Sequence, residues 1–387
     1  MRLIDTNQAL TEFCQELINE AFIAVDLEFL REKTYYAKLC LIQVASPNHA
    51  AIIDPLAENI DLSAFFTLMK NPNITKVFHS GRQDIEIIYN QSGFIPEPLF
   101  DTQIAAQVCG FGEAVSYENL VKSVLGIQLD KSSRLSDWSL RPLDTKQLEY
   151  ALSDVTHLVN IYTFLQNKLS ETGRLHWLDE EIAILKSPDT YIVRPEDAWQ
   201  KIRHRSHNSK VLTILRELAA WRERRAQNKN TPRQSIIKDD CLINIAAACP
   251  TSKEELEKIR NIRKDVVSGK LGDEILDVIN IALQIPSSAY IKPEHDKPLP
   301  NGANALYELL RMLLKIRAQE QGVVAKLIAS DEDLKNFAVS ANTENPILKG
   351  WRLEIFGSDA LALRSGELSI SYNPTKRNIE LIKKAGN

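Results

Sequence analysis

The stretch AFIAVDLEFL, residues 21–30, decides how this sequence is to be read. Its apolar run ends in two carboxylates, Asp26 and Glu28, separated by Leu27. In a β-strand alternate side chains point to opposite faces, so both acids lie on one face with Cα atoms about 6.5–7 Å apart. The apolar residues before them predict a strand covered on both sides. Two acids on such a strand repel each other and lose solvation, which predicts either a cation beside them or a strand that ends at the surface.

The composition indicates a globular protein of more than one domain. The chain has 387 residues, of which 44% are hydrophobic and 25% charged, and this length exceeds that of one ordinary core. No apolar run is long enough to cross a bilayer, and the N-terminus lacks the pattern of a signal peptide. The five cysteines form no CxxC pair, which argues against a zinc or redox site. We therefore expect a cytoplasmic protein that does not contact a membrane.

Charge is distributed unevenly along the chain. Residues 1–200 hold 16 basic and 28 acidic side chains, a net charge of −12, whereas residues 201–290 hold 17 and 11, a net charge of +6. The acidic residues 1–200 are suited to binding metal ions, and the basic residues 201–290 are suited to binding a polyanion. The same imbalance can also arise between ordinary solvated surfaces.

The first hundred residues alternate strand and helix signals, which indicates an α/β domain. From about residue 103 the pattern becomes helical, and the longest helix is expected over 144–169 with Asp144 as its N-cap. The earlier strand signals cover 22–29, 38–46, 50–55 and 74–80, and a helix signal covers 62–71.

The C-terminal half contains an internal repeat. Shifting the sequence by 92 residues places segment 215–248 on segment 307–340 without a gap. The identical positions include the triplet Arg-Ala-Gln at 225–227 and 317–319. Two copies of a small helical domain follow from this repeat. The expected domains cover 1–185, 208–290 and 298–375, with a linker over 186–207.

Further acids follow that are expected to converge on the first pair. Asp84 stands near the start of an expected helix, which Ser80 is placed to cap, and an acid there also stabilises the helix dipole. Tyr150 and Asp154 are four residues apart, so they share one face of the long helix. Asp154 lies beside the apolar stripe of that helix and is expected to face inward. An inward carboxylate is costly without a partner, which predicts a metal ion or a basic group opposite it.

The order of these residues resembles the DEDDy 3′→5′ exonucleases, which have an RNase H-like fold. The segments VDLEFLREKTYYAKLCLIQVA, FHSGRQDIEII and SDWSLRPLDTKQLEYALSDVTHL are similar to the ribonuclease D branch. The paired C-terminal repeats are similar to tandem HRDC domains, named after helicases and RNase D. The resemblance spans essentially the whole chain. It implies an α/β RNase H-like exonuclease domain, with a mixed sheet flanked by helices, followed by two small all-α HRDC domains.

The resemblance also implies the chemistry of the site. Two divalent cations would activate the attacking water and stabilise the leaving 3′ oxygen. Oxygen ligands suit Mg²⁺ or Mn²⁺. Tyr150 has an ordinary pKa of about 10, so it is a poor general base and is expected to orient the water. The cations would be bound by the carboxylates of Asp26, Glu28, Asp84 and Asp154.

Four further residues are candidates for substrate contacts. His79 lies near Asp84 in the sequence and either touches the substrate or fills the core. Lys131 and Arg141 flank the long helix and either hold phosphates or pair with acids at the surface. Tyr35 either stacks on a terminal base or packs against its neighbours.

The resulting functional prediction is a phosphodiester hydrolase, a 3′→5′ exoribonuclease that releases 5′-mononucleotides. Its expected partner is RNA with a free 3′ end, with tRNA precursors and other small structured RNAs implied by the resemblance, and no obligatory protein partner is evident. A DNA 3′→5′ exonuclease is an alternative with the same catalytic set, and the helical repeats argue against it. A non-catalytic RNA-binding protein is an alternative from another class, and the complete set of acids argues against it.

Overall fold

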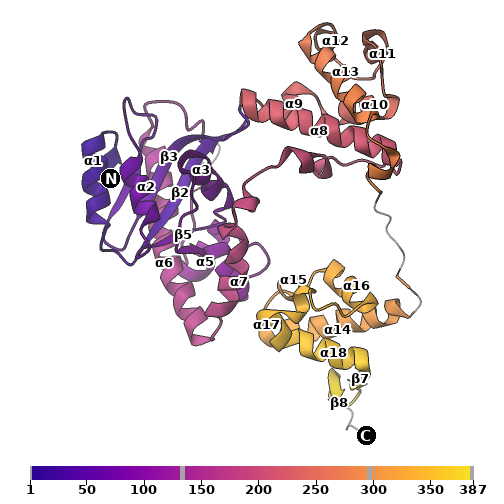
Figure 1. Cartoon of the computed structure of the whole chain (residues 1–387). Helices are drawn as coiled ribbons and strands as arrows, with labels where there is room; N and C mark the ends of the chain where they lie inside the picture. The colour runs from indigo at the N-terminus through magenta and orange to yellow at the C-terminus, as the bar shows by residue number, and fades with distance from the viewer. Residues whose placement is uncertain (1, 131–135, 294–298, 301, 384–387) are drawn as a thin grey trace.

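The computed structural model of the chain describes residues 2–130, 136–293, 299–300 and 302–383. Three lobes follow one another along the chain: an α/β lobe and two lobes that are mostly helical (Figure 1). Lys131, an expected phosphate contact, lies outside the described residues. Within the described residues, no helix combines the length and the apolar character that a membrane span requires.

The α/β lobe is built on a six-stranded mixed sheet in the order β1-β4-β3-β2-β5-β6, which confirms the expected class of this domain. β2 (Phe22–Leu30) is central, antiparallel to β3 (Lys38–Ala45) and parallel to β5 (Thr75–Phe78). The other strands are short, and two of them, β1 and β6, escaped the sequence analysis. They are β1 (Leu3–Ile4), β4 (Ala50–Ile53) and β6 (Leu99–Asp101).

The central position of β2 follows from its sequence. Ile23, Ala24 and Val25 are fully buried, because this part of the strand is covered on both faces. The long helix α6 (Thr145–Glu171) packs across β2, β3 and β4. The other helices of the lobe are α1 (Asn7–Glu16), α2 (Ser63–Lys70), α3 (Arg82–Ser92), α4 (Thr102–Val108), α5 (Tyr117–Leu125) and α7 (Leu175–Lys186).

Local chemistry sets the start of α6. Asp144 is its N-cap, as expected, and forms a capping box with Gln147: the Asp144 side chain accepts from the Gln147 N–H at 2.8 Å, and the Gln147 side chain accepts from the Asp144 N–H at 3.0 Å. The buried stripe of α6, which includes Val155 and Leu158, faces the sheet. This fixes the rotation of the helix and therefore the direction of Tyr150 and Asp154.

The repeat is visible in the helix boundaries of the two later lobes. The first helical lobe begins with three helices, α8 (Ser209–Lys229), α9 (Arg233–Ile236) and α10 (Asp239–Ala248), and contains three more. Equivalent helices follow 92 residues later and end within one residue of the shifted positions. They are α14 (Ala303–Gln321), α15 (Ala325–Ile328) and α16 (Asp331–Val339). The first lobe is completed by α11 (Lys253–Glu257), α12 (Lys264–Ser268) and α13 (Lys270–Leu283).

The second helical lobe is not all-α, so this part of the predicted fold class is wrong. After α17 (Gly350–Arg352) and α18 (Ser358–Ser365), the lobe ends in an antiparallel hairpin of β7 (Leu368–Asn373) and β8 (Asn378–Lys383). Leu368 at the start of β7 is buried and Ile370 on the same face is half-buried, so the hairpin is anchored to the lobe at this end. The repeat did not reveal the hairpin, because the repeat covers only the first three helices of each lobe.

The second helical lobe is packed tightly against the α/β lobe. Trp351 is fully buried and stacks on Trp177 of α7, with ring centroids 4.2 Å apart and planes 13° apart. Gly110 of the α/β lobe has a φ of +88°, and a Cβ there would come within 2.2 Å of the Gly322 carbonyl oxygen. The close approach of two backbones therefore requires a glycine at this contact.

Candidate active site

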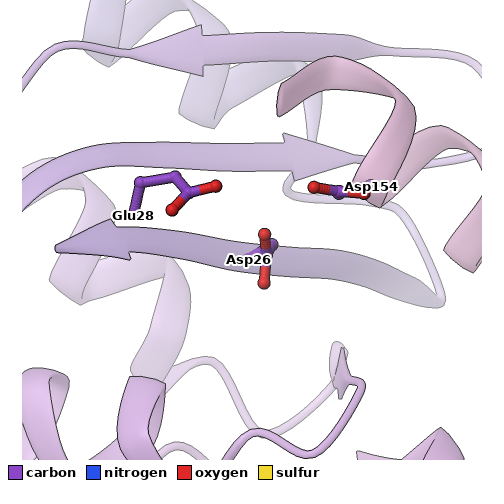
Figure 2. A group of neighbouring side chains, drawn as sticks. All are labelled: Asp26, Glu28 and Asp154. Atoms are coloured by element: carbon purple, nitrogen blue, oxygen red, sulfur yellow. The ribbon is translucent and has the colours of Figure 1, made fainter. Parts of the chain in front are cut away.

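Three carboxylates from two elements meet above the central strand. Asp26 and Glu28 lie on one face of β2, and Asp154 points toward them from α6 (Figure 2). One carboxylate oxygen from each of the three lies within 4.8 Å of the others. The pleat of the strand brings the first two together, and the packing of α6 on the sheet adds the third.

The fourth acid, Asp84, arrives on a third element. It is buried in the first turn of α3, as expected, and it lines the same cavity as the other three acids. The helix begins at Gly81, where a Cβ would come within 2.4 Å of the Phe78 Cβ, and Ser80 has a φ of +57°. The expectation that Ser80 caps α3 is therefore wrong. The carboxylate of Asp101 holds this turn, because it accepts from the N–H groups of Ser80 at 3.2 Å and Gly81 at 2.8 Å.

The ionised forms of the four acids are disfavoured, first by burial and then, for Glu28, Asp84 and Asp154, by neighbouring acids. Burial raises the pKa of Asp26 to about 6 and the pKa of Asp154 to about 8. Burial and the neighbouring acids raise the pKa of Glu28 to about 9 and lift the pKa of Asp84 well above its ordinary value. The charged neighbours that raise these pKa values are other acids of the site and Asp101.

These properties fit the binding of hard divalent cations. The convergent donors are carboxylate oxygens, which suit Mg²⁺ or Mn²⁺. Positive charge at this point would relieve the mutual repulsion of the acids. The cavity has a volume of about 480 Å³. Its lining includes Asp26, Glu28, His79, Gln83, Asp84, Gln103, Tyr117, Asp130, Tyr150 and Asp154.

Tyr150 lies one helical turn before Asp154 and hydrogen-bonds to its carboxylate, which lowers the pKa of Asp154 against the effect of burial. Its ring stacks on the buried ring of Trp138, with centroids 6.2 Å apart and planes 28° apart. Packing on one side and a carboxylate on the other fix the Tyr150 hydroxyl at the cavity.

His79 lines the cavity and is also built into the scaffold. Its Nδ1 lies 3.0 Å from the Thr102 hydroxyl oxygen, and that hydroxyl lies 3.0 Å from the Phe78 carbonyl oxygen, to which it donates. Burial lowers the pKa of His79, so the neutral ring is favoured. Both expectations for this residue, substrate contact and core packing, remain compatible with its position.

Of the two roles expected for Arg141, a phosphate contact or an ion pair with an acid, the structure shows the ion pair. Its guanidinium pairs with Asp54 through Nε and Nη2, both at 2.6 Å. The remaining N–H groups donate at 2.8 Å to the carbonyl oxygens of Trp138, Leu140 and Cys40. All five donors of the side chain are therefore used, and none is left for a phosphate.

Tyr35 also differs from the expected base-stacking role. It is buried, and its hydroxyl donates to Glu223 on α8 of the first helical lobe. Packing was the other role expected for Tyr35, but nothing in the sequence indicated that its partner lies 188 residues away. Only the tertiary packing brings Glu223 to it.

Two residues of the site region escaped the sequence analysis: Tyr117, which lines the cavity, and Asp101, which holds the turn before Asp84. Tyr117 is largely enclosed, and its hydroxyl donates to the Ser153 carbonyl oxygen at 3.2 Å, which ties α5 to α6 beside the acids. Asp101 organises the turn before Asp84 and also caps α4 through the N–H groups of Gln103 and Ile104. The only signal for Asp101 was an acid directly after a short apolar segment, which is common.

Comparison with known proteins places the chain among nucleases. A family model described as 3'-5' exonuclease matches residues 1–170, and one described as HRDC domain matches residues 211–279. The chain is 44% identical over 380 residues to Ribonuclease D of Jannaschia sp., covering 97% of this chain and 98% of the relative. It is 42% identical over 380 residues to Ribonuclease D of Bartonella henselae, covering 98% and 93%. Among solved structures it is similar to Escherichia coli RNase D, described as an exoribonuclease involved in structured RNA processing, with a TM-score of 0.81, 29% identity and coverage of 94% and 98%.

The raised pKa values predict how cation-free protein responds to pH. The folded site keeps protons that the unfolded chain releases, because unfolded carboxyls titrate at about pH 4. Between about pH 4 and about pH 9 these acids should therefore make the free energy of unfolding fall as pH rises. Mg²⁺ competes with the same protons, so one Mg²⁺ concentration should raise the melting temperature more at about pH 8.5 than at about pH 6.

Thermal melts with and without Mg²⁺ at the two pH values measure this effect. At about 100 times its dissociation constant, Mg²⁺ should stabilise the fold by roughly 2.7 kcal/mol. In Asp154→Asn the dependence of the Mg²⁺ effect on pH should shrink, whereas the exposed control Asp277→Asn on α13 should behave like the wild type. A Mg²⁺ effect that is equal at both pH values in the wild type would contradict the competition.

Proposed function

Because the chain belongs to the ribonuclease D family and is a 3′→5′ exoribonuclease, we propose that it releases 5′-mononucleotides by hydrolysis at a site for two divalent cations. The observation that carries this proposal is the convergence of acids from β2, α3 and α6 in one cavity with raised pKa values. The residues proposed to hold the cations are Asp26, Glu28, Asp84 and Asp154.

Each part of the site has a proposed task. Two cations bound by Asp26, Glu28, Asp84 and Asp154 would supply positive charge to activate the attacking water and stabilise the leaving 3′ oxygen. Tyr150 is proposed to orient the water through its hydroxyl, which Trp138 and Asp154 hold in place. A tyrosine hydroxyl in water has a pKa of about 10, which argues against a role as general base near neutral pH.

Structured RNAs such as tRNA precursors are the proposed substrates, and the linker with the first helical lobe is proposed to hold them. The solved Escherichia coli RNase D is described as acting in structured RNA processing. Exposed cations gather in and after the linker, whereas other arginines of the first helical lobe are bound in ion pairs and are less available to phosphate. The exposed cations are Lys201, Arg203, Arg205 and Lys210. The paired arginines are Arg222, Arg225 and Arg233.

The second helical lobe is proposed to be a diverged copy of the HRDC domain. Its first three helices repeat those of the first lobe at the same spacing. Its hairpin, however, has no counterpart among the helices of the first lobe. A cytoplasmic location remains a prediction from the sequence.

Matched RNA and DNA strands, each labelled in the 3′-terminal nucleotide, test the reaction. With Mg²⁺, labelled 5′-mononucleotide should leave the RNA, and Asp154→Asn should slow this release by at least about a hundredfold, since even indirect loss of ligand support costs ~10–100-fold in metal sites. Asp277→Asn serves as the control for charge. Equal rates on DNA would favour the DNA exonuclease, and a variant Asp154→Asn with more than half the wild-type rate would contradict the cation site.

Tyr150→Phe should reduce kcat by roughly tenfold to a hundredfold while leaving cation affinity nearly unchanged, because it removes one positioning hydroxyl and no carboxylate. Initial rates and calorimetric titration with Mn²⁺ measure the two quantities. Tyr162→Phe, on the same helix and packed against Phe22, is the matched control. A fall in Mn²⁺ affinity as large as the fall in kcat would show that Tyr150 supports the acids and does not orient water.

The role of the exposed cations is tested by the salt dependence of RNA binding. Arg203→Gln with Arg205→Gln, in an Asp154→Asn background that prevents digestion, should weaken binding of a tRNA precursor. The slope of log affinity against log salt should become shallower by about 0.7–0.9 per lost phosphate contact. Arg311→Gln with Lys315→Gln on α14 makes the same charge change elsewhere. Equal slopes for the wild type and the variant with Arg203→Gln and Arg205→Gln would mean that these linker residues do not bind RNA phosphates.

A further inference from the structure

Tyr35 belongs to the α/β lobe in sequence and to the first helical lobe in packing. It lies in the connection between β2 and β3, directly after the strand that carries Asp26 and Glu28. Only 9% of its surface is exposed, and it forms part of one hydrophobic core with residues of α8 and α9, among them Leu218 and Ile236. The first helical lobe therefore buries a side chain of the α/β lobe in its own hydrophobic core.

Polar contacts hold the same connection against the helical lobe. The Tyr35 hydroxyl donates to the fully buried carboxylate of Glu223, and Arg233 Nε lies 2.8 Å from the other oxygen of that carboxylate. The Arg233 guanidinium also lies 5.5 Å from the centre of the Tyr35 ring. The Tyr36 N–H donates to Asn230 Oδ1 at 2.9 Å. A buried carboxylate depends on all its partners, so this network resists small displacements.

The connection is tied to the active site at its other end. Arg31 pairs with Glu86 on α3 through two N–O contacts of 2.6 and 3.2 Å, and Glu86 lies two residues after Asp84. Glu28 lies three residues before Arg31, where the pairing of β2 with β3 shifts register between Glu28 and Phe29. Such a bulge aims the side chains beside it, so the position of the connection affects the direction of Glu28.

We propose that Tyr35 and Glu223 are positioning residues, through which the first helical lobe holds Glu28 and Asp84 in the geometry that binds cations. The inference rests on the proposed function, because it concerns carboxylates of the cation site. It gives the first helical lobe a task inside the molecule that is distinct from holding RNA. The lobe thereby stabilises the active site through the connection between β2 and β3.

Full-length Tyr35→Phe, Glu223→Gln and the double variant test this proposal. Calorimetric titration with Mn²⁺ measures cation affinity without turnover. Rates on a short single-stranded oligoribonucleotide give kcat and KM. Amide hydrogen exchange of residues 31–37 reports whether the connection is held, since the Tyr36 N–H is bound to the helical lobe.

Tyr35→Phe should weaken Mn²⁺ binding by about tenfold, the lower end of the ~10–100-fold effect of groups that support metal ligands. The value of kcat should fall with it, KM for the oligoribonucleotide should stay within about twofold, and exchange of residues 31–37 should accelerate. Glu223→Gln should act in the same direction. The double variant should be little worse than either single one, because both changes break one contact.

Two controls separate positioning from general stability. Tyr36→Phe makes the same chemical change at the exposed neighbour and keeps the backbone contact to Asn230. Glu181→Gln breaks a comparable ion pair, 2.5 Å long, between α7 and Arg352 of the second helical lobe. Both controls should leave Mn²⁺ affinity at the wild-type level, although Glu181→Gln should lower the melting temperature.

The outcomes distinguish this proposal from the proposed function. If Tyr35→Phe and Glu223→Gln both bind Mn²⁺ as tightly as the wild type at temperatures where they are folded, the positioning role is overturned. It is overturned equally if Glu181→Gln weakens Mn²⁺ binding as much as they do. If the wild type itself neither binds Mn²⁺ nor degrades RNA, the proposed function fails, and hydrogen exchange still shows whether the connection is held.

Discussion

The mutual repulsion of buried carboxylates is the constraint on which the rest of the structure depends. Acids from three different elements are held in one cavity although burial and neighbouring charge disfavour their ionised forms. Such an arrangement persists only when the surrounding fold determines each position independently. The fold does so with a central strand whose residues 23–25 are fully buried, a long capped helix across the sheet, and a tight turn before α3.

Polar residues outside the acid cluster supply much of this control. Asp101 fixes the turn before α3 through backbone N–H groups. Arg141 joins the segment before α6 to Asp54 and Cys40 with three of its N–H groups. Trp138, held in the same segment, packs against Tyr150. Buried polar groups with complete sets of partners are rigid, which is the property a cation site requires of its supports.

The helical lobes are bound to the α/β lobe by buried contacts as well as by the chain. The first lobe encloses Tyr35, and the second stacks Trp351 on Trp177 and brings Gly322 against Gly110. These contacts use side chains that a freely moving appendage would leave exposed. The arginines of the first helical lobe and the linker have different roles. Arg222, Arg225 and Arg233 form ion pairs within the lobe, and Arg233 also lies over the Tyr35 ring, whereas Arg203 and Arg205 are exposed.

The sequence by itself determined the features that depend on local order and spacing. These features are the alternation in β2, the four-residue spacing of Tyr150 and Asp154, the cap at Asp144 and the 92-residue repeat. The first two follow from periods of 2 and 3.6 residues, the cap from the residue type at the start of the helix, and the repeat from comparing the sequence with itself. The tertiary structure alone decided the partners of long polar side chains. Tyr35, Arg141 and Asp101 have no local signal for their roles, because their partners lie 20 to 188 residues away, and a side chain that reaches across lobes leaves no period in the sequence.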